Sequence, residues 1–199
     1  MDGFFTGIGS RNTPEKYLNI LENVSRFIVD TYKLKLRSGH AVGADRACEK
    51  GANGFADIYL PWKTYGIRPY KNDPGMEVIG NAIIPEREKE IAEFMCDLVA
   101  RKPYQEMERG VQLLMERNVN QIIGHTDPVH ELSRIVLCYS PDIGGTSYAT
   151  ALARHFDIHI TNILNLNLSE VIEEVDSVIP STSRIKLTKA EILEGIYNL

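Results

Sequence analysis

Short apolar runs alternate with amphipathic stretches along most of the chain. The apolar runs have the length of buried strands, and they cover residues 4–8, 34–36, 56–60, 135–139 and 158–163. The stretches between them repeat apolar residues at helical spacing, as in Tyr17, Leu21, Val24 and Ile28. We expect Thr13 to cap that first helix, with Pro14 at its first position. This alternation predicts an α/β fold with a mainly parallel sheet covered on both faces.

The middle and the end of the chain depart from this rhythm. Residues 63–80 are polar and contain several glycines and prolines, which predicts a loop, and helical patterns follow at 86–100 and 105–118. The tail holds two short helical patterns, and the second opens with a Thr188–Glu191 capping box. We therefore expect one α/β domain over residues 1–164, with a helical insertion at about 63–120, and a helical extension over 165–199.

Composition excludes several classes of protein. The chain has 199 residues, 43% of them hydrophobic, which suffices for one packed core. No apolar run approaches the roughly 18 residues of a membrane span, and no secretion signal is visible, so we expect no membrane partner and a cytoplasmic location. The 3 cysteines lie far apart, which is typical of free thiols. A net charge of -5 argues against a general nucleic-acid binder.

Three glycine-containing turns follow predicted strands. In a parallel sheet all three fall at the carboxyl edge, where ligands bind, and the helix start behind each turn offers unpaired amides to a phosphate. The turns are Gly7-Ile8-Gly9-Ser10-Arg11, Ser38-Gly39-His40-Ala41-Val42-Gly43-Ala44-Asp45 and Gly144-Gly145-Thr146. Asn12 stands where a dinucleotide fingerprint needs its third glycine, so we expect neither NAD nor FAD and no other cofactor.

Each candidate residue also has a purely structural interpretation. Asp45 either complements the dipole of its helix or faces the crevice, where it would accept hydrogen bonds from a ribose. Gly144 and Gly145 serve either close helix packing or the approach of a phosphate. Trp62 either packs at a strand end or stacks on a base. The histidines are too scattered for a metal site, and His40 is interpreted as a turn residue.

Taken together, the three turns and the segment Arg117–Gly124 resemble the SLOG superfamily. This Rossmann-like group includes DprA/Smf (DNA-processing protein A), the YspA-like proteins and small phage and bacterial DprA-like proteins. The resemblance covers about residues 4–163 and implies a Rossmann-like three-layer α/β/α fold with a nucleotide pocket. Relatives of the LOG phosphoribohydrolase type carry a glutamate shortly after the third turn, whereas Ser147-Tyr148-Ala149-Thr150 contains no acid.

We predict that the crevice binds a nucleotide or a nucleotide-derived small molecule. Ser10 and Arg11 would hold a phosphate, and Asp45 would contact the sugar or, if the protein is an N-glycosidic hydrolase, activate water. The predicted ligand-binding residues are Gly7, Gly9, Ser10, Arg11, Ser38, Gly39, Gly43, Ala44, Asp45, Asn118, Asp142, Gly144, Gly145 and Thr146.

Two alternatives stay open. The first is DprA-like binding of single-stranded DNA in recombination, which requires a basic groove. The residues available for such a groove are Arg11, Arg46, Lys63, Arg68 and Lys71. The second is a regulatory module that forms a homo-oligomer through the tail helices.

Overall fold

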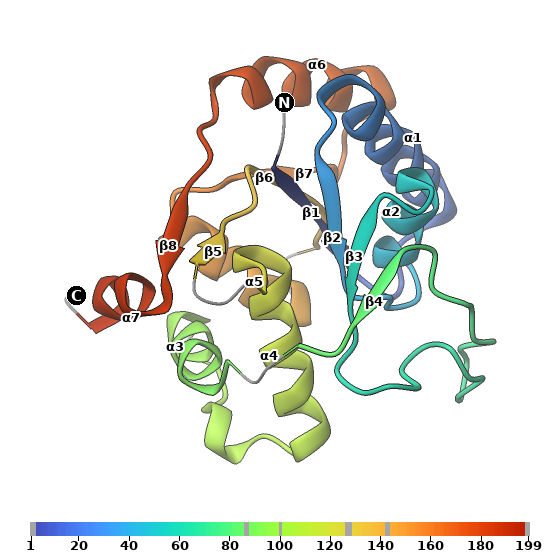
Figure 1. The fold of residues 1–199 in the computed structure, drawn as a ribbon. Helices are drawn as coiled ribbons and strands as arrows, with labels where there is room; N and C mark the ends of the chain where they lie inside the picture. The colour runs from blue at the N-terminus through green and yellow to red at the C-terminus, as the bar shows by residue number, and fades with distance from the viewer. Residues whose placement is uncertain (1–2, 86–87, 100, 126–128, 142–143, 198–199) are drawn as a thin grey trace.

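The computed structural model describes residues 3–85, 88–99, 101–125, 129–141 and 144–197 (Figure 1). The strands are β1 (Phe4–Gly9), β2 (Lys35–Ser38), β3 (Ala56–Tyr59), β4 (Asn81–Ile83), β5 (Val129–Glu131), β6 (Ile135–Tyr139), β7 (His159–Asn162) and β8 (Lys186–Thr188). The helices are α1 (Glu15–Tyr32), α2 (Ala44–Ala52), α3 (Lys89–Val99), α4 (Arg109–Ile123), α5 (Gly145–His155), α6 (Leu168–Val178) and α7 (Lys189–Tyr197). Short 3-10 turns lie at Tyr104–Glu106 and Ile179–Ser181.

Six strands form one parallel sheet in the order β4-β3-β2-β1-β6-β7. From β1 the chain first builds outwards through β2, β3 and β4, and it returns to the other side of β1 with β6 and β7. The strand order therefore reverses at β1. The connections that follow β1 and β6 lead to helices on opposite faces of the sheet, which opens a crevice between them. The Rossmann-like α/β fold expected from the sequence is confirmed, with helices on both faces of a mainly parallel sheet.

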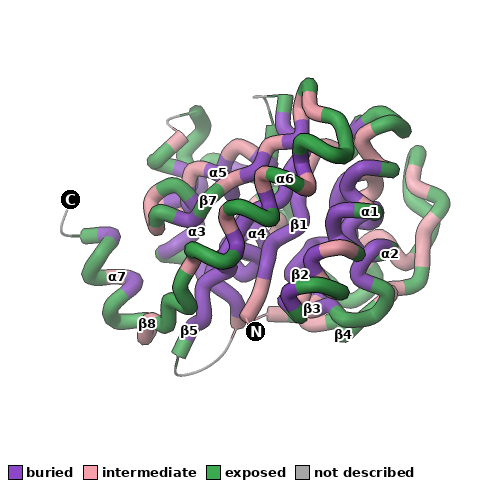
Figure 2. Tube along the Cα trace, turned by 90° about the horizontal axis from the view of Figure 1, so that it is seen from above, coloured by how far each residue is buried: buried purple, intermediate pink, exposed green. Residues whose placement is uncertain are grey.

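The strands supply two separate cores because successive side chains point to opposite faces. In β6, Ile135, Leu137 and Tyr139 pack against α1, α2 and α6, whereas Val136 and Cys138 pack against α4 and α5. Figure 1 shows α1 and α2 on one side of the sheet and α3, α4 and α5 on the other. The view from above in Figure 2 places most of the buried residues on the strands and on the helix faces turned towards them.

Several element boundaries differ from the expected ones. Thr13 does not cap α1: its hydroxyl donates to the Ser10 carbonyl, and the helix begins at Glu15 after Pro14. Helix α4 continues to Ile123, five residues beyond the expected end, because Ile122 and Ile123 are buried in the second core. The edge strand β4 and the pair β5–β8 were not expected, since these three-residue strands are too short to show a periodic pattern.

The tail returns to the body of the protein at two places. Helix α6 packs on α1, with Val171 and Val175 fully buried in the first core. Strand β8 pairs antiparallel with β5, and α7 follows with the expected reciprocal bonds between Thr188 and Glu191. No helix in the described residues has the length and apolarity needed to cross a membrane.

Candidate functional site

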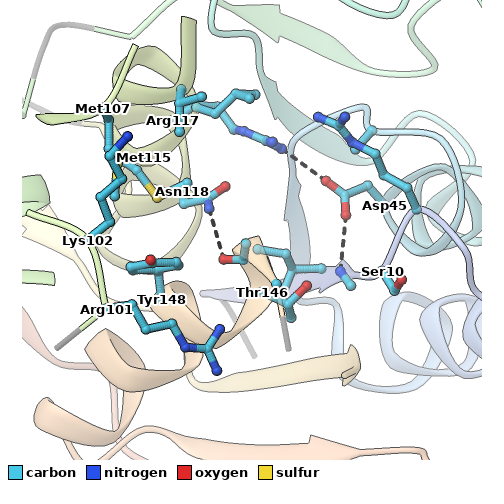
Figure 3. Close-up of a pocket in the computed structure, with 18 of the residues that line it drawn as sticks. Ser10, Asp45, Arg101, Lys102, Met107, Met115, Arg117, Asn118, Thr146 and Tyr148 are labelled. Atoms are coloured by element: carbon cyan, nitrogen blue, oxygen red, sulfur yellow. Dashed lines mark hydrogen bonds and ion pairs between the residues drawn. The ribbon is translucent and has the colours of Figure 1, made fainter. Parts of the chain in front are cut away.

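A cleft of about 780 Å³ lies at the carboxyl end of β1, where the strand order of the sheet reverses. The turn after β1 contributes Gly9, Ser10 and Arg11, and the start of α2 contributes Asp45. The other walls come from α4 and from the start of α5, the helix that follows β6. The cleft therefore joins residues of all three predicted glycine turns with a helix that is distant in sequence (Figure 3).

Asp45 is the most enclosed acid of the cleft, with 1% of its surface exposed. One carboxylate oxygen accepts from the Gly9 amide at 3.1 Å, and the other accepts from Arg117 Nη1 at 3.0 Å. Burial raises the pKa of Asp45, while the Arg117 guanidinium and the backbone amides act in the opposite direction. The carboxylate thus ties α4 to the β1 turn across the sheet edge.

The glycines divide into two groups according to the space around them. A methyl group on Gly9 would lie 2.5 Å from Ala44 Cβ, and one on Gly39 would overlap the Arg117 side chain. These glycines allow close packing of α2 and α4 on the strand ends. In contrast, no atom of the described residues lies within 4 Å of a methyl group placed on Gly144 or Gly145. Packing therefore explains the first group but not the Gly-Gly pair at α5, which leaves the helix start open.

The start of α5 has the properties of an anion site. Its N-cap residue is Gly144, which has φ 138° and provides no side-chain cap, and the first amides of a helix lack intrahelical acceptors. Asn118 donates to the Gly145 carbonyl at 3.4 Å. Asn118 Oδ1 and Arg117 Nε are buried and have no hydrogen-bond partner among the residues that the structure describes. Because Asn118 contacts α5 directly, its unsatisfied Oδ1 points to a missing polar partner at the start of this helix.

An apolar wall faces this polar corner. It comes from α4 and the segment before it, and in Figure 3 Met107 and Met115 lie on this side of the cleft, with Lys102 next to them. Tyr148 and Arg101 lie below them, on the side of α5. An apolar wall opposite a few convergent polar groups is the usual construction of a small-molecule site.

A second hollow of about 830 Å³, which we call the aromatic groove, adjoins the cleft. It is lined by the segment Trp62–Asp73 and the start of α4. Trp62 is 39% exposed and Tyr70 is 69% exposed, and the Lys71 ammonium lies 5.2 Å from the Tyr70 ring centroid. Exposed aromatic rings next to cations are the elements of a base-stacking surface.

Two buried contacts fix the segment that carries these rings. Arg46 forms a bidentate pair with Asp73 at 2.7 and 2.9 Å and also donates to the Gly66 carbonyl. His40 bonds Glu49 at 2.7 Å and the Met76 carbonyl at 2.8 Å. The prediction that Arg46 contributes to a DNA-binding groove is therefore wrong, because its guanidinium is buried in the ion pair with Asp73.

The structure separates the predicted ligand-binding residues into three sets. Those that line the cleft are Gly9, Ser10, Arg11, Asp45, Asn118, Gly144, Gly145 and Thr146. Those that do not line it are Gly7, Ser38, Gly39, Gly43 and Ala44. Ser38, for example, is fully buried and donates to the Gly7 carbonyl at 2.7 Å, so it braces β1 and β2. Asp142 lies outside the described residues.

Sequence reasoning gave no role to Arg117 or to the apolar wall. Arg117 stands directly before Asn118 in a segment that the family resemblance had singled out, which was the available signal. Its pairing with Asp45, 72 positions away, has no local signature. Within the described residues, no group of His, Cys, Asp or Glu side chains is arranged to hold a metal ion, and the three cysteines are buried and unpaired.

The chain matches no protein-family model and no curated protein sequence. Among solved structures it is similar to DNA processing protein A from Helicobacter pylori, whose structure was described for its single-stranded DNA binding mode. The TM-score is 0.54 at 18% sequence identity, over 91% of this chain and 79% of that one. At this identity the similarity shows the shared α/β fold.

Proposed function

We propose that the cleft binds a nucleotide or a nucleotide-derived small molecule through its phosphate. One observation carries the proposal: Asn118 contacts the Gly145 carbonyl at the start of α5, and its buried Oδ1 has no hydrogen-bond partner among the described residues. A phosphate there would accept hydrogen bonds from the first amides of α5, and Arg117, which also lines the cleft, would add positive charge. A hydroxyl of the ligand, or a bridging water, would satisfy Asn118 Oδ1.

The remaining walls suit the rest of a nucleotide. Met107 and Met115 offer polarizable apolar surface to a base. Ser10 and Arg11 lie at the opposite side, where Arg11 donates to the Tyr65 hydroxyl at 3.2 Å and its guanidinium stays exposed. The cleft volume of about 780 Å³ falls within the range of roughly 300–1,000 Å³ that is usual for small-molecule sites.

Binding without hydrolysis is favoured by the position of Asp45. Both of its oxygens already accept hydrogen bonds, one from the Gly9 amide and one from Arg117. A general base needs an oxygen within hydrogen-bond reach of the water that it activates. We therefore assign Asp45 the role of orienting Arg117, and N-glycosidic hydrolysis stays a prediction for the chromatographic assay below.

Calorimetric titration with thymidine and adenosine mono-, di- and triphosphates tests the proposal. Thr146→Val removes only a hydroxyl at the start of α5, and Arg11→Ala removes a guanidinium. Loss of a hydrogen bond to a charged group weakens binding by about 1.5–3 kcal/mol, roughly 10- to 100-fold. Arg26→Ala on the exposed side of α1 is the matched control and should leave affinity unchanged. Absence of binding by every nucleotide would refute the proposal. Chromatography of the same mixtures tests N-glycosidic hydrolysis, because hydrolysis would release a free base.

Single-stranded DNA is the second candidate, supported by the aromatic groove. The structural neighbour from Helicobacter pylori binds single-stranded DNA, and Arg68 and Lys71 line the groove beside exposed rings here. A gel shift with a thymidine oligonucleotide at increasing salt tests it, because phosphate contacts weaken steeply with salt. Arg68→Ala should weaken the shift if strands bind in the groove, and no shift even at low salt would eliminate this candidate.

A further inference from the structure

We infer that the preferred ligand is the end of a short single strand, with its terminal phosphate in the cleft and the following bases in the aromatic groove. The inference rests on the proposed phosphate site and assigns it a longer ligand than a mononucleotide. Three independent features of the two hollows carry it: their continuity, their charge and their aromatic surface.

The two hollows form one continuous path. Arg11, Glu108, Val111 and Leu114 line both of them. Tyr65 stands at the junction: its hydroxyl accepts from Arg11 at 3.2 Å, and its ring centroid lies 5.7 Å from the Arg117 guanidinium carbon. On the far side its ring meets Trp62 edge-on at 5.0 Å. A ligand that leaves the phosphate corner therefore passes Tyr65 and enters the groove.

Both hollows carry more positive than negative charge among the described residues that line them. Arg11 and Glu108 are shared and cancel each other. The cleft also contains Arg101 and Lys102 next to the Arg117–Asp45 pair. A phosphate in the cleft would therefore meet positive charge.

The aromatic groove is positive as well. Arg68 and Lys71 line it, and its acid Asp73 is already paired with the buried Arg46. Successive phosphates of one strand would therefore contact cations in both hollows.

The groove also supplies surface that a mononucleotide in the cleft would leave unused. Tyr70 is 69% exposed and Trp62 is 39% exposed. Both belong to the segment that the buried Arg46–Asp73 pair holds in place. Fixed, exposed rings can stack on bases of any identity, since every base presents a π-face. The strand end would thus be recognised by its phosphate and its bases together, without sequence preference.

The test is calorimetry of the full chain with four probes. They are tetrathymidylate with a 5′-phosphate, with a 3′-phosphate and with neither, and thymidine 5′-monophosphate. We expect one phosphorylated tetramer, and with it the polarity of the strand, to bind at least about tenfold more tightly than the unphosphorylated tetramer and the monophosphate. Tyr70→Ala should weaken that tetramer by about tenfold and leave the monophosphate unchanged. Tyr197→Ala, which changes an equally exposed tyrosine on α7, is the matched control.

The possible failures are distinguishable. Equal affinity of phosphorylated and unphosphorylated tetramers overturns the inference, because the terminal phosphate would then not be recognised. Equal affinity of the monophosphate and the phosphorylated tetramers, with no effect of Tyr70→Ala, also overturns it but leaves the proposed nucleotide site intact. Binding of neither the monophosphate nor any phosphorylated tetramer refutes the proposed function itself.

Discussion

The substitution Arg117→Met would leave the buried carboxylate of Asp45 without its positively charged partner. Arg117 and Asp45 have side chains only 6% and 2% exposed, and their contact is 3.0 Å long. Removing one partner of a buried ion pair typically costs about 3–5 kcal/mol, because the other charge remains without water or counter-charge. For a chain of this length that cost lowers the midpoint of thermal unfolding by about 6–20 °C.

The loss of stability in Arg117→Met should depend on pH. Burial already raises the pKa of Asp45, and without Arg117 the pKa rises further above its unfolded value of about 3.9. Between these two values the folded state binds more protons than the unfolded state, so stability falls as the pH rises. The free energy of unfolding of the variant should therefore increase as the pH is lowered from the raised pKa of Asp45 towards its unfolded value, by at most about 1.4 kcal/mol per pH unit.

Urea unfolding followed by far-UV circular dichroism measures both effects. Arg26→Met is the control, because it breaks an exposed Arg26–Glu22 pair on α1 and should cost at most about 0.5 kcal/mol without this pH slope. Adding Asp45→Asn to Arg117→Met removes the isolated charge and should restore part of the loss and abolish the slope. A cost below about 1 kcal/mol, or one independent of pH, would refute the assignment of a buried ion pair.

Three further predictions concern the glycines of the turns, the buried cysteines and the cap of α7. Gly9→Ala should destabilise by about 1–3 kcal/mol, because its methyl group would meet a neighbour at 2.5 Å. Gly145→Ala has open space and should change stability by less than about 1 kcal/mol; equal unfolding midpoints of the two variants would contradict this. Burial raises the pKa of Cys48 and Cys138 to about 12. Near pH 8 these thiols of the folded protein should therefore react with a disulfide reagent far more slowly than those of the urea-unfolded chain. Immediate reaction of the folded protein would be inconsistent with their burial. Thr188→Ala removes the capping hydroxyl of α7 and should cost about 1 kcal/mol, with faster amide exchange in that helix; unchanged exchange would show that the cap contributes nothing.

Elements with a strong internal period could be predicted from the sequence, and elements that depend on a neighbour could not. Strand β6 was predicted with its observed bounds because five apolar residues in a row are typical of a strand buried on both faces. Strand β4 has two exposed residues out of three and is ordered by pairing with β3, so its own pattern is weak. The same holds for β5 and β8, which pair across more than 50 positions of the chain.

The location of the candidate site could also be predicted only in part from the sequence. The turns after β1 and β6 could be placed at one sheet edge, because parallel strands end together. The sequence could not show which of these glycines leave space for a ligand, because that depends on the residues that pack against them. Ala44 lies close to Gly9, whereas no described residue lies close to Gly145.

The sequence by itself determined the α/β alternation, the sheet edge that holds the turns and the residues of those turns, because all three follow from local periodicity and backbone preference. Only the tertiary structure decided that Asp45 is paired with Arg117, that α4 supplies an apolar wall, and that Arg46 is buried instead of available. These decisions bring together residues from distant segments. The burial that makes such contacts strong exists only after the chain has packed.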